Sequence, residues 1–122
     1  MERFGKNKCG QELIIDLFGC DYKSISSKKK IIEYVDKVCR LTKMRKYGKT
    51  AIERFGEKTV WGEGYSFFQF IEESSISGHF LEEEKAAFIN IFSCKPFNDE
   101  IATKFTKKFF KSKKEKKITL FR

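Results

Sequence analysis

The chain has 122 residues, of which 40% are hydrophobic, and it contains 14 phenylalanines but only one proline. This composition suits a single globular domain over residues 1–122 and excludes a disordered or linker-rich chain. No apolar run approaches the roughly 20 residues of a membrane-spanning helix, and the charged start, MERFGKNKCG, lacks the apolar segment of a secretory signal. We therefore expect a cytoplasmic protein without a membrane partner.

The formal net charge of +9 lies mostly at one end of the chain. Residues 104–122 contain eight lysines, one arginine and one glutamate, a balance of +8, which leaves +1 for the other 103 residues. Phe105, Phe109 and Phe110 recur at helical spacing among these lysines, which favours the solvated face of an amphipathic helix. We therefore expect no nucleic-acid partner, although a segment of this charge can also bind RNA or an anionic surface.

Four cysteines stand at positions 9, 20, 39 and 94 without a Cys-x-x-Cys pair, and the chain has one histidine. A zinc site needs more such ligands at metal-binding spacing, so we expect no metal. Without a secretory signal, reduced thiols are favoured over two disulfides. We expect three of the cysteines to pack as small hydrophobic side chains, with Cys94 as the exception.

Hydrophobic periodicity predicts an alternation of strands and helices. The expected elements, in chain order, are a strand at 11–20, a helix at 24–44, a strand at 49–55, a glycine-bearing loop at 56–64, strands at 65–73 and 85–94, a helix at 98–112 and a strand at 117–121. Ser27 is the predicted N-cap of the first helix, and Asn98 or Asp99 that of the second. This order predicts an α+β fold, a two-layer α/β sandwich in which two helices cover one face of a mostly antiparallel sheet.

The expected strand at 65–73 carries apolar side chains on both of its faces. The residues of the two faces alternate, with Phe67, Gln69 and Ile71 on one and Phe68, Phe70 and Glu72 on the other. Helices on one side of the sheet can cover only one of these faces, so the other implies a partner. We therefore expect a homodimer in which sheet packs against sheet.

The segment EESSISGH, residues 72–79, places the only histidine of the chain five residues after Ser74. The simple interpretation is a polar strand and turn. The alternative is a self-processing serine, in which the Ser74 hydroxyl attacks the carbonyl of Glu73 and converts the peptide bond to an ester. Elimination of that ester leaves a dehydroalanine, which hydrolyses to a pyruvoyl group. A pyruvoyl carbonyl forms a Schiff base with a substrate amine and acts as an electron sink for decarboxylation.

Three stretches of the sequence share their motifs and spacing with one known family: GQELIIDLFGCD (10–21), YSFFQFIEESSISGH (65–79) and AAFINIFSC (86–94). They resemble the opening motif, the processing segment and the Phe-x-Cys strand of the prokaryotic S-adenosylmethionine decarboxylases. The most specific feature is the spacing, with His79 five residues after Ser74 and Cys94 fifteen residues beyond His79. The resemblance extends from residue 10 to the last strand, and it implies a dimeric α/β sandwich with an antiparallel sheet.

The resemblance also implies the roles of individual residues. Ser74 is implied to be the precursor of a covalent pyruvoyl cofactor, with cleavage of the peptide bond between Glu73 and Ser74. His79 and Ser66 are implied to assist this processing reaction. Cys94 is implied to be the proton donor during decarboxylation.

The substrate pocket departs from the family pattern. Glu83 stands where the family has a carboxylate that holds ribose hydroxyls, but Val60 replaces an aromatic residue that stacks on adenine. Trp61, beside it, is either a core residue or a stacking platform for adenine, and the neighbouring glycines favour the platform. The segment after His79 reads Phe-Leu-Glu-Glu where the family has Thr-Trp-Pro-Glu, and Ser75 replaces a family histidine.

These features predict a pyruvoyl-dependent decarboxylase that cleaves itself into residues 1–73 and 74–122. The expected substrate is S-adenosylmethionine, whose decarboxylation supplies aminopropyl groups for spermidine and other polyamines. Similar members of the family act on plain basic amino acids, so L-ornithine or L-arginine is the alternative substrate. An inactive paralogue that serves as a regulatory subunit is a further alternative, and it predicts an uncleaved chain.

Overall fold

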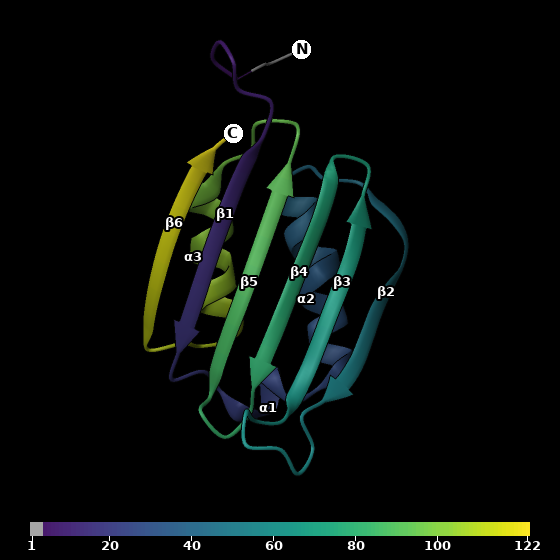
Figure 1. Ribbon diagram of the computed structural model, residues 1–122, viewed down its shortest axis with the longest axis vertical. Coiled ribbons are helices and arrows are strands. Elements are labelled where there is room, and N and C mark those ends of the chain that lie inside the picture. The colour runs from purple at the N-terminus through teal and green to yellow at the C-terminus, as the bar shows by residue number, and fades with distance from the viewer. Residues whose placement is uncertain (1–3) are drawn as a thin grey trace.

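A computed structural model describes residues 4–122 of the chain. Its elements, in chain order, are β1 (Gln11–Phe18), α1 (Tyr22–Ile25), α2 (Lys28–Leu41), β2 (Lys46–Phe55), β3 (Gly64–Ile71), β4 (Ser74–Leu81), β5 (Ala86–Ser93), α3 (Asp99–Phe109) and β6 (Lys114–Phe121). Figure 1 shows two layers, with the sheet in front and the helices behind it. The predicted α+β sandwich with helices on one face is therefore confirmed.

The six strands form one sheet in the order β2-β3-β4-β5-β1-β6. Every neighbouring pair of strands is antiparallel. The first strand of the chain, β1, lies between β5 and the last strand, β6, so the two ends of the sequence meet in the sheet (Figure 1). The sheet is thus antiparallel throughout the described residues.

The predicted helix at 24–44 is divided into α1 and α2 by two serines. The Ser26 hydroxyl donates to the Tyr22 carbonyl at 2.6 Å, and the Ser27 side chain accepts from the Lys30 amide at 3.1 Å. Serine side chains that bond to the nearby backbone end one helix and begin the next. Ser27 is therefore the N-cap of α2 as predicted, and the structure has three helices where two were expected, because α1 is a single short turn.

Strand β4 was absent from the expected elements, and only the interpretation of residues 72–79 as a polar strand and turn anticipated it. It pairs with β3 on one side and with β5 on the other. Its alternating residues are Ile76, Gly78 and Phe80, which are buried, and Ser75, Ser77 and His79, which lie on the opposite face. Serine and glycine have low strand propensity, so burial between two neighbouring strands determines this element.

The core lies between the sheet and the helices α2 and α3. Tyr34 of α2 is fully buried, and its hydroxyl is 2.7 Å from Thr106 Oγ1 of α3. The Tyr34 and Phe110 rings lie 4.8 Å apart, and Ile89 and Ile91 of β5 contribute fully buried side chains beneath the helices. Burial of such a side chain stabilises the fold by roughly 1.5–3 kcal/mol. Among the described residues, no helix is long and apolar enough to cross a bilayer.

We predict that Gly78→Ala destabilises the protein by about 1–3 kcal/mol, because overpacking forces neighbouring groups to move. A Cβ atom at Gly78 would lie 2.2 Å from Cε2 of the buried Phe67 ring on β3. Urea denaturation monitored by circular dichroism measures the effect. The matched control is Gly5→Ala, whose added Cβ has no heavy atom within 4 Å. Equal stability of the two variants would contradict the close packing of β3 on β4.

Candidate active site

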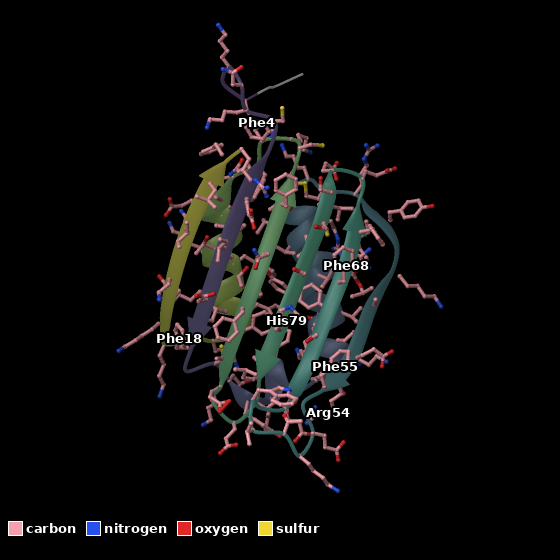
Figure 2. All side chains as sticks on the ribbon, in the orientation of Figure 1. Phe4, Phe18, Arg54, Phe55, Phe68 and His79 are labelled. Atoms are coloured by element: carbon pink, nitrogen blue, oxygen red, sulfur yellow. The ribbon has the colours of Figure 1, made fainter. Side chains whose placement is uncertain are left out.

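One face of the sheet carries no helix among residues 4–122. Figure 2 looks onto this face, where Phe18, Phe68 and His79 lie in front of the strands. Phe68 and Phe70 are 39% and 60% exposed, although their rings contact each other with centroids 4.8 Å apart. The predicted second apolar face of the strand at 65–73 is thus confirmed, and it is a surface suited to another protein.

A serine and the histidine form a pair on this open face. Ser66 of β3 and His79 of β4 stand directly opposite each other in the strand register. The distance between Ser66 Oγ and His79 Nδ1 is 2.7 Å, which is a hydrogen bond. One partner donates and the other accepts according to the imidazole tautomer. The pair can therefore relay a proton between the serine hydroxyl and the imidazole ring.

The peptide bond between Glu73 and Ser74 lies at a tight turn. Ile71 pairs with Ser74, so Glu72 and Glu73 alone connect β3 to β4. The Glu73 carbonyl oxygen accepts a hydrogen bond from the Cys94 amide at 2.9 Å. This donor polarises the carbonyl and can stabilise negative charge on its oxygen during attack by a hydroxyl.

The structure divides the predicted reactive residues into two groups. Ser74 and Cys94 lie together, because Ser74 pairs with Ser93 at the end of β5. His79 lies five residues further along β4, which at roughly 3.3 Å per residue is about 17 Å from Ser74. Ser66 accompanies His79 through their hydrogen bond. Within one chain, the serine–histidine pair therefore cannot reach Ser74.

An arginine that the sequence analysis missed organises the other end of β3 and β4. Arg54 of β2 donates to both carboxylate oxygens of Glu82 at 2.5 and 2.7 Å, and to Glu63 at 2.9 and 3.0 Å. Its guanidinium also lies 5.2 Å from the centroid of the Tyr65 ring. The hydrogen bonds with Glu82, followed by those with Glu63, raise the pKa of Arg54 above its ordinary value. This cluster joins the two ends of the 56–63 loop to the end of β4.

The two predicted substrate-binding residues flank this cluster. Trp61 stands in the 56–63 loop and is 72% exposed, so it is not a core residue. Glu83 follows β4 and is exposed, whereas its neighbour Glu82 is buried against Arg54. Ser66 and His79 lie within a few residues of these segments along β3 and β4. Trp61, Glu83 and the serine–histidine pair thus share one end of the sheet.

The cysteines differ in exposure. Cys20 and Cys39 are buried as expected, and burial raises the pKa of each thiol to about 11. Cys94 is exposed, as its expected role requires. The expectation that Cys9 is buried was wrong. Cys9 precedes β1 in a terminal segment whose backbone bonds to Arg122, and its side chain remains exposed.

Comparison with known proteins places the chain among decarboxylating enzymes. The sequence model of the family described as S-adenosylmethionine decarboxylase matches residues 11–122, which is all of the chain except its first ten residues. The chain therefore belongs to the S-adenosylmethionine decarboxylase family. The family to which the motifs pointed is confirmed.

Individual relatives agree with this assignment. The S-adenosylmethionine decarboxylase proenzymes of Clostridium botulinum strains Hall and Okra are each 33% identical to the chain over 85 residues, which is 70% of this chain and 68% of theirs. The crystal structure of the adenosylmethionine decarboxylase from Aquifex aeolicus VF5 has a TM-score of 0.80 and 20% sequence identity, and the match covers 94% of this chain and 91% of that chain. At this identity, the structural likeness shows that the two proteins share their fold.

We predict that iodoacetamide at pH 8 alkylates Cys9 and Cys94 of the folded protein and leaves Cys20 and Cys39 unmodified. The first two thiols are exposed, whereas burial and a pKa near 11 keep the other two protonated and inaccessible. Peptide mass mapping identifies the modified sites. Protein unfolded in guanidinium should be alkylated at all four positions. Rapid labelling of Cys39 in the folded protein would contradict the described packing.

Proposed function

We propose that the chain is a proenzyme that cleaves itself between Glu73 and Ser74 and then decarboxylates S-adenosylmethionine. The fragments are residues 1–73 and 74–122, and the second begins with the pyruvoyl group formed from Ser74. The observation that carries this proposal is the Glu73 carbonyl, which accepts from the Cys94 amide beside Ser74. The word proenzyme in the names of the botulinum relatives supports it. The product would supply aminopropyl groups for spermidine and other polyamines.

The cleavage chemistry uses groups of the chain itself. The Ser74 hydroxyl oxygen attacks the Glu73 carbonyl carbon, the C–N bond breaks, and the freed Ser74 nitrogen takes a proton. The Cys94 amide donates to the oxygen that becomes negative during the attack. A base then removes the Ser74 Cα proton, the Cβ–O bond breaks, and Glu73 leaves as a carboxylate. Water hydrolyses the resulting dehydroalanine, which releases ammonia and leaves the pyruvoyl group.

The acid–base groups for this reaction come from a second copy of the chain. Ser66 and His79 are about 17 Å along β4 from Ser74 of their own chain, at roughly 3.3 Å per residue. A two-fold axis that packs two open sheet faces against each other can bring this end of one sheet to the opposite end of the other. The exposed Phe68 and Phe70 side chains supply apolar surface for such contact. We therefore propose a homodimer whose two sites each combine residues of both chains.

The same site carries out decarboxylation. The pyruvoyl group supplies a carbonyl that holds the substrate amine and withdraws electrons from the bond that breaks. Cys94 follows Ser93, which pairs with Ser74, and in this proposal its exposed thiol donates a proton to the product carbon. Trp61 supports a nucleoside substrate over L-ornithine or L-arginine, because its exposed ring can stack on adenine. In this proposal Glu83 binds the ribose hydroxyls.

We predict that freshly purified protein consists of two fragments, and that Ser74→Ala protein is intact and inactive because it lacks the attacking hydroxyl. Cys94→Ala keeps the backbone amide that faces Glu73, so it should still self-cleave, while its decarboxylation rate falls by about a hundredfold or more for lack of the acid. Intact mass under denaturing conditions and release of labelled carbon dioxide measure the two steps. An unbroken wild-type chain would favour the inactive regulatory subunit.

We predict that mixing two inactive variants restores activity. Ser74→Ala and His79→Ala chains are co-expressed, so that a mixed dimer contains one site with an intact Ser74 and an intact His79 from the other chain. Random pairing gives about a quarter of the wild-type activity, because half of the dimers are mixed and each has one complete site. Co-expression of Ser74→Ala with Cys94→Ala is the control, since both changes fall in the group that one chain supplies. Failure of the Ser74→Ala and His79→Ala mixture to regain activity, or restoration of the control as well, would contradict the shared site.

A further inference from the structure

We infer that the Glu73 side chain is a positioning residue for self-cleavage, because its buried carboxylate holds the turn and keeps the backbone of Ser74 in a strained conformation. This inference rests on the proposed self-cleavage. It assigns a function to the side chain of Glu73 and to its contacts with Arg45 and Lys95, none of which takes part directly in the bond changes. Each contact is made by the side chain of Glu73, the residue on the amino-terminal side of the bond that breaks.

The Glu73 carboxylate is enclosed by two segments distant in sequence. Its side chain is 9% exposed, and Oε1 accepts from the Arg45 amide at 3.1 Å. Oε2 lies 3.7 Å from Arg45 Nε and 3.9 Å from Lys95 Nζ. The adjacent Glu72 amide donates to the Arg45 carbonyl at 2.8 Å. Arg45, just before β2, therefore bonds to the turn between β3 and β4 through both its backbone amide and its backbone carbonyl.

The strongest of these contacts is the hydrogen bond to the Arg45 backbone. The Arg45 side chain is 77% exposed, so its ion pair with Glu73 is screened by water and contributes little. A buried carboxylate that accepts from a backbone amide forms a charge-assisted bond of fixed geometry. We therefore expect the rate of self-cleavage to depend more on the Oε1 acceptor of Glu73 than on the negative charge of its carboxylate.

Ser74 connects two fixed segments and has a φ angle of +155°. On its amino-terminal side, Glu73 is held through its carboxylate and through its carbonyl bond to Cys94. On its carboxyl-terminal side, β4 is paired with both β3 and β5. A residue with a Cβ adopts this backbone region only where its surroundings impose it.

The strain has a direct link to cleavage. When the peptide bond becomes an ester, the Ser74 nitrogen is released from Glu73, and the constraint on φ disappears. Strain that is lost along the reaction favours the products and lowers the barrier. Backbone strain of this kind corresponds to about a tenfold to hundredfold change in rate. Glu73 would thus accelerate the attack without touching the hydroxyl that performs it.

The first test follows the rate of self-cleavage in protein made by cell-free synthesis and quenched at intervals for intact mass measurement. Glu73→Ala should cleave about tenfold more slowly or worse, because the turn is no longer held. Glu73→Gln retains the oxygen that accepts from the Arg45 amide, so its rate should stay within about threefold of wild type. Glu100→Ala, which removes a 67% exposed acid of α3 on the helix layer, is the matched control and should cleave normally.

A second measurement separates positioning from general stability. Ser74→Gly and Ser74→Ala chains both lack the attacking hydroxyl and cannot cleave. The unfolding temperature of each is measured with the wild-type Glu73 and again with the additional change Glu73→Ala. Glycine accepts a φ of +155° readily, so Ser74→Gly should unfold at a higher temperature than Ser74→Ala while Glu73 is present. The advantage of glycine should shrink in the Glu73→Ala background, because the strain is then released.

The possible outcomes distinguish the inference from the function on which it rests. Wild-type protein that never cleaves would overturn the proposed function, and the thermal comparison would still decide whether Glu73 imposes strain. Cleaving wild-type protein together with Glu73→Ala protein that cleaves at the same rate would overturn the inference alone. An equal advantage of glycine in both backgrounds would also overturn it. Slow cleavage of Glu73→Ala with rescue by Glu73→Gln would support it.

Discussion

The hydrogen bond from the Cys94 amide to the Glu73 carbonyl is the contact on which the rest of the candidate site depends. It joins the end of β5 to the turn between β3 and β4, and so it brings Cys94 close to Ser74 in the sheet. Its geometry requires that β4 pair with β5 in one register, because a shift of one residue would turn every side chain of β4 to the opposite face. The core residues of β4, such as Ile76 and Phe80, fix that register through burial. Packing on the inner face therefore determines the chemistry available at the edge of the turn.

The two faces of the sheet have different functions. The inner face is sealed by α2 and α3, and its contacts provide most of the stability. The outer face carries Phe68, Phe70 and the Ser66–His79 pair, and no helix of residues 4–122 lies in front of them. A polar pair on the same face as exposed aromatic rings suits a site that is completed by association, since contact between two sheets would exclude water from the pair. In the proposed dimer, assembly and catalysis would be linked, because a single chain has both groups of residues but cannot bring them together.

The sequence predicted the sandwich, the positions of five strands and the faces of the strand at 65–73, because these follow from periodicity within one segment. It did not predict the division of the first helix, which depends on hydrogen bonds of Ser26 and Ser27. Spacing in the sequence grouped Ser74, His79 and Cys94, yet it cannot show that His79 lies a strand's length from Ser74. No sequence pattern predicted that Arg54 pairs with Glu82 or that Glu73 pairs with Arg45. Each of these bonds joins residues 28 positions apart, which only the folded sheet brings together.

The order of the strands has a consequence for the cut protein. Residues 1–73 contain β1, β2 and β3, and residues 74–122 contain β4, β5 and β6, yet β1 lies between β5 and β6. Three of the five strand pairings, β3 with β4, β5 with β1 and β1 with β6, would then join different polypeptides. The two fragments would therefore remain associated through these strand pairings as long as the protein is folded. After unfolding, however, the two fragments would have to associate again by diffusion. Cleavage would thus change refolding from a unimolecular to a bimolecular reaction, and the active protein would refold less readily after denaturation than the uncleaved chain.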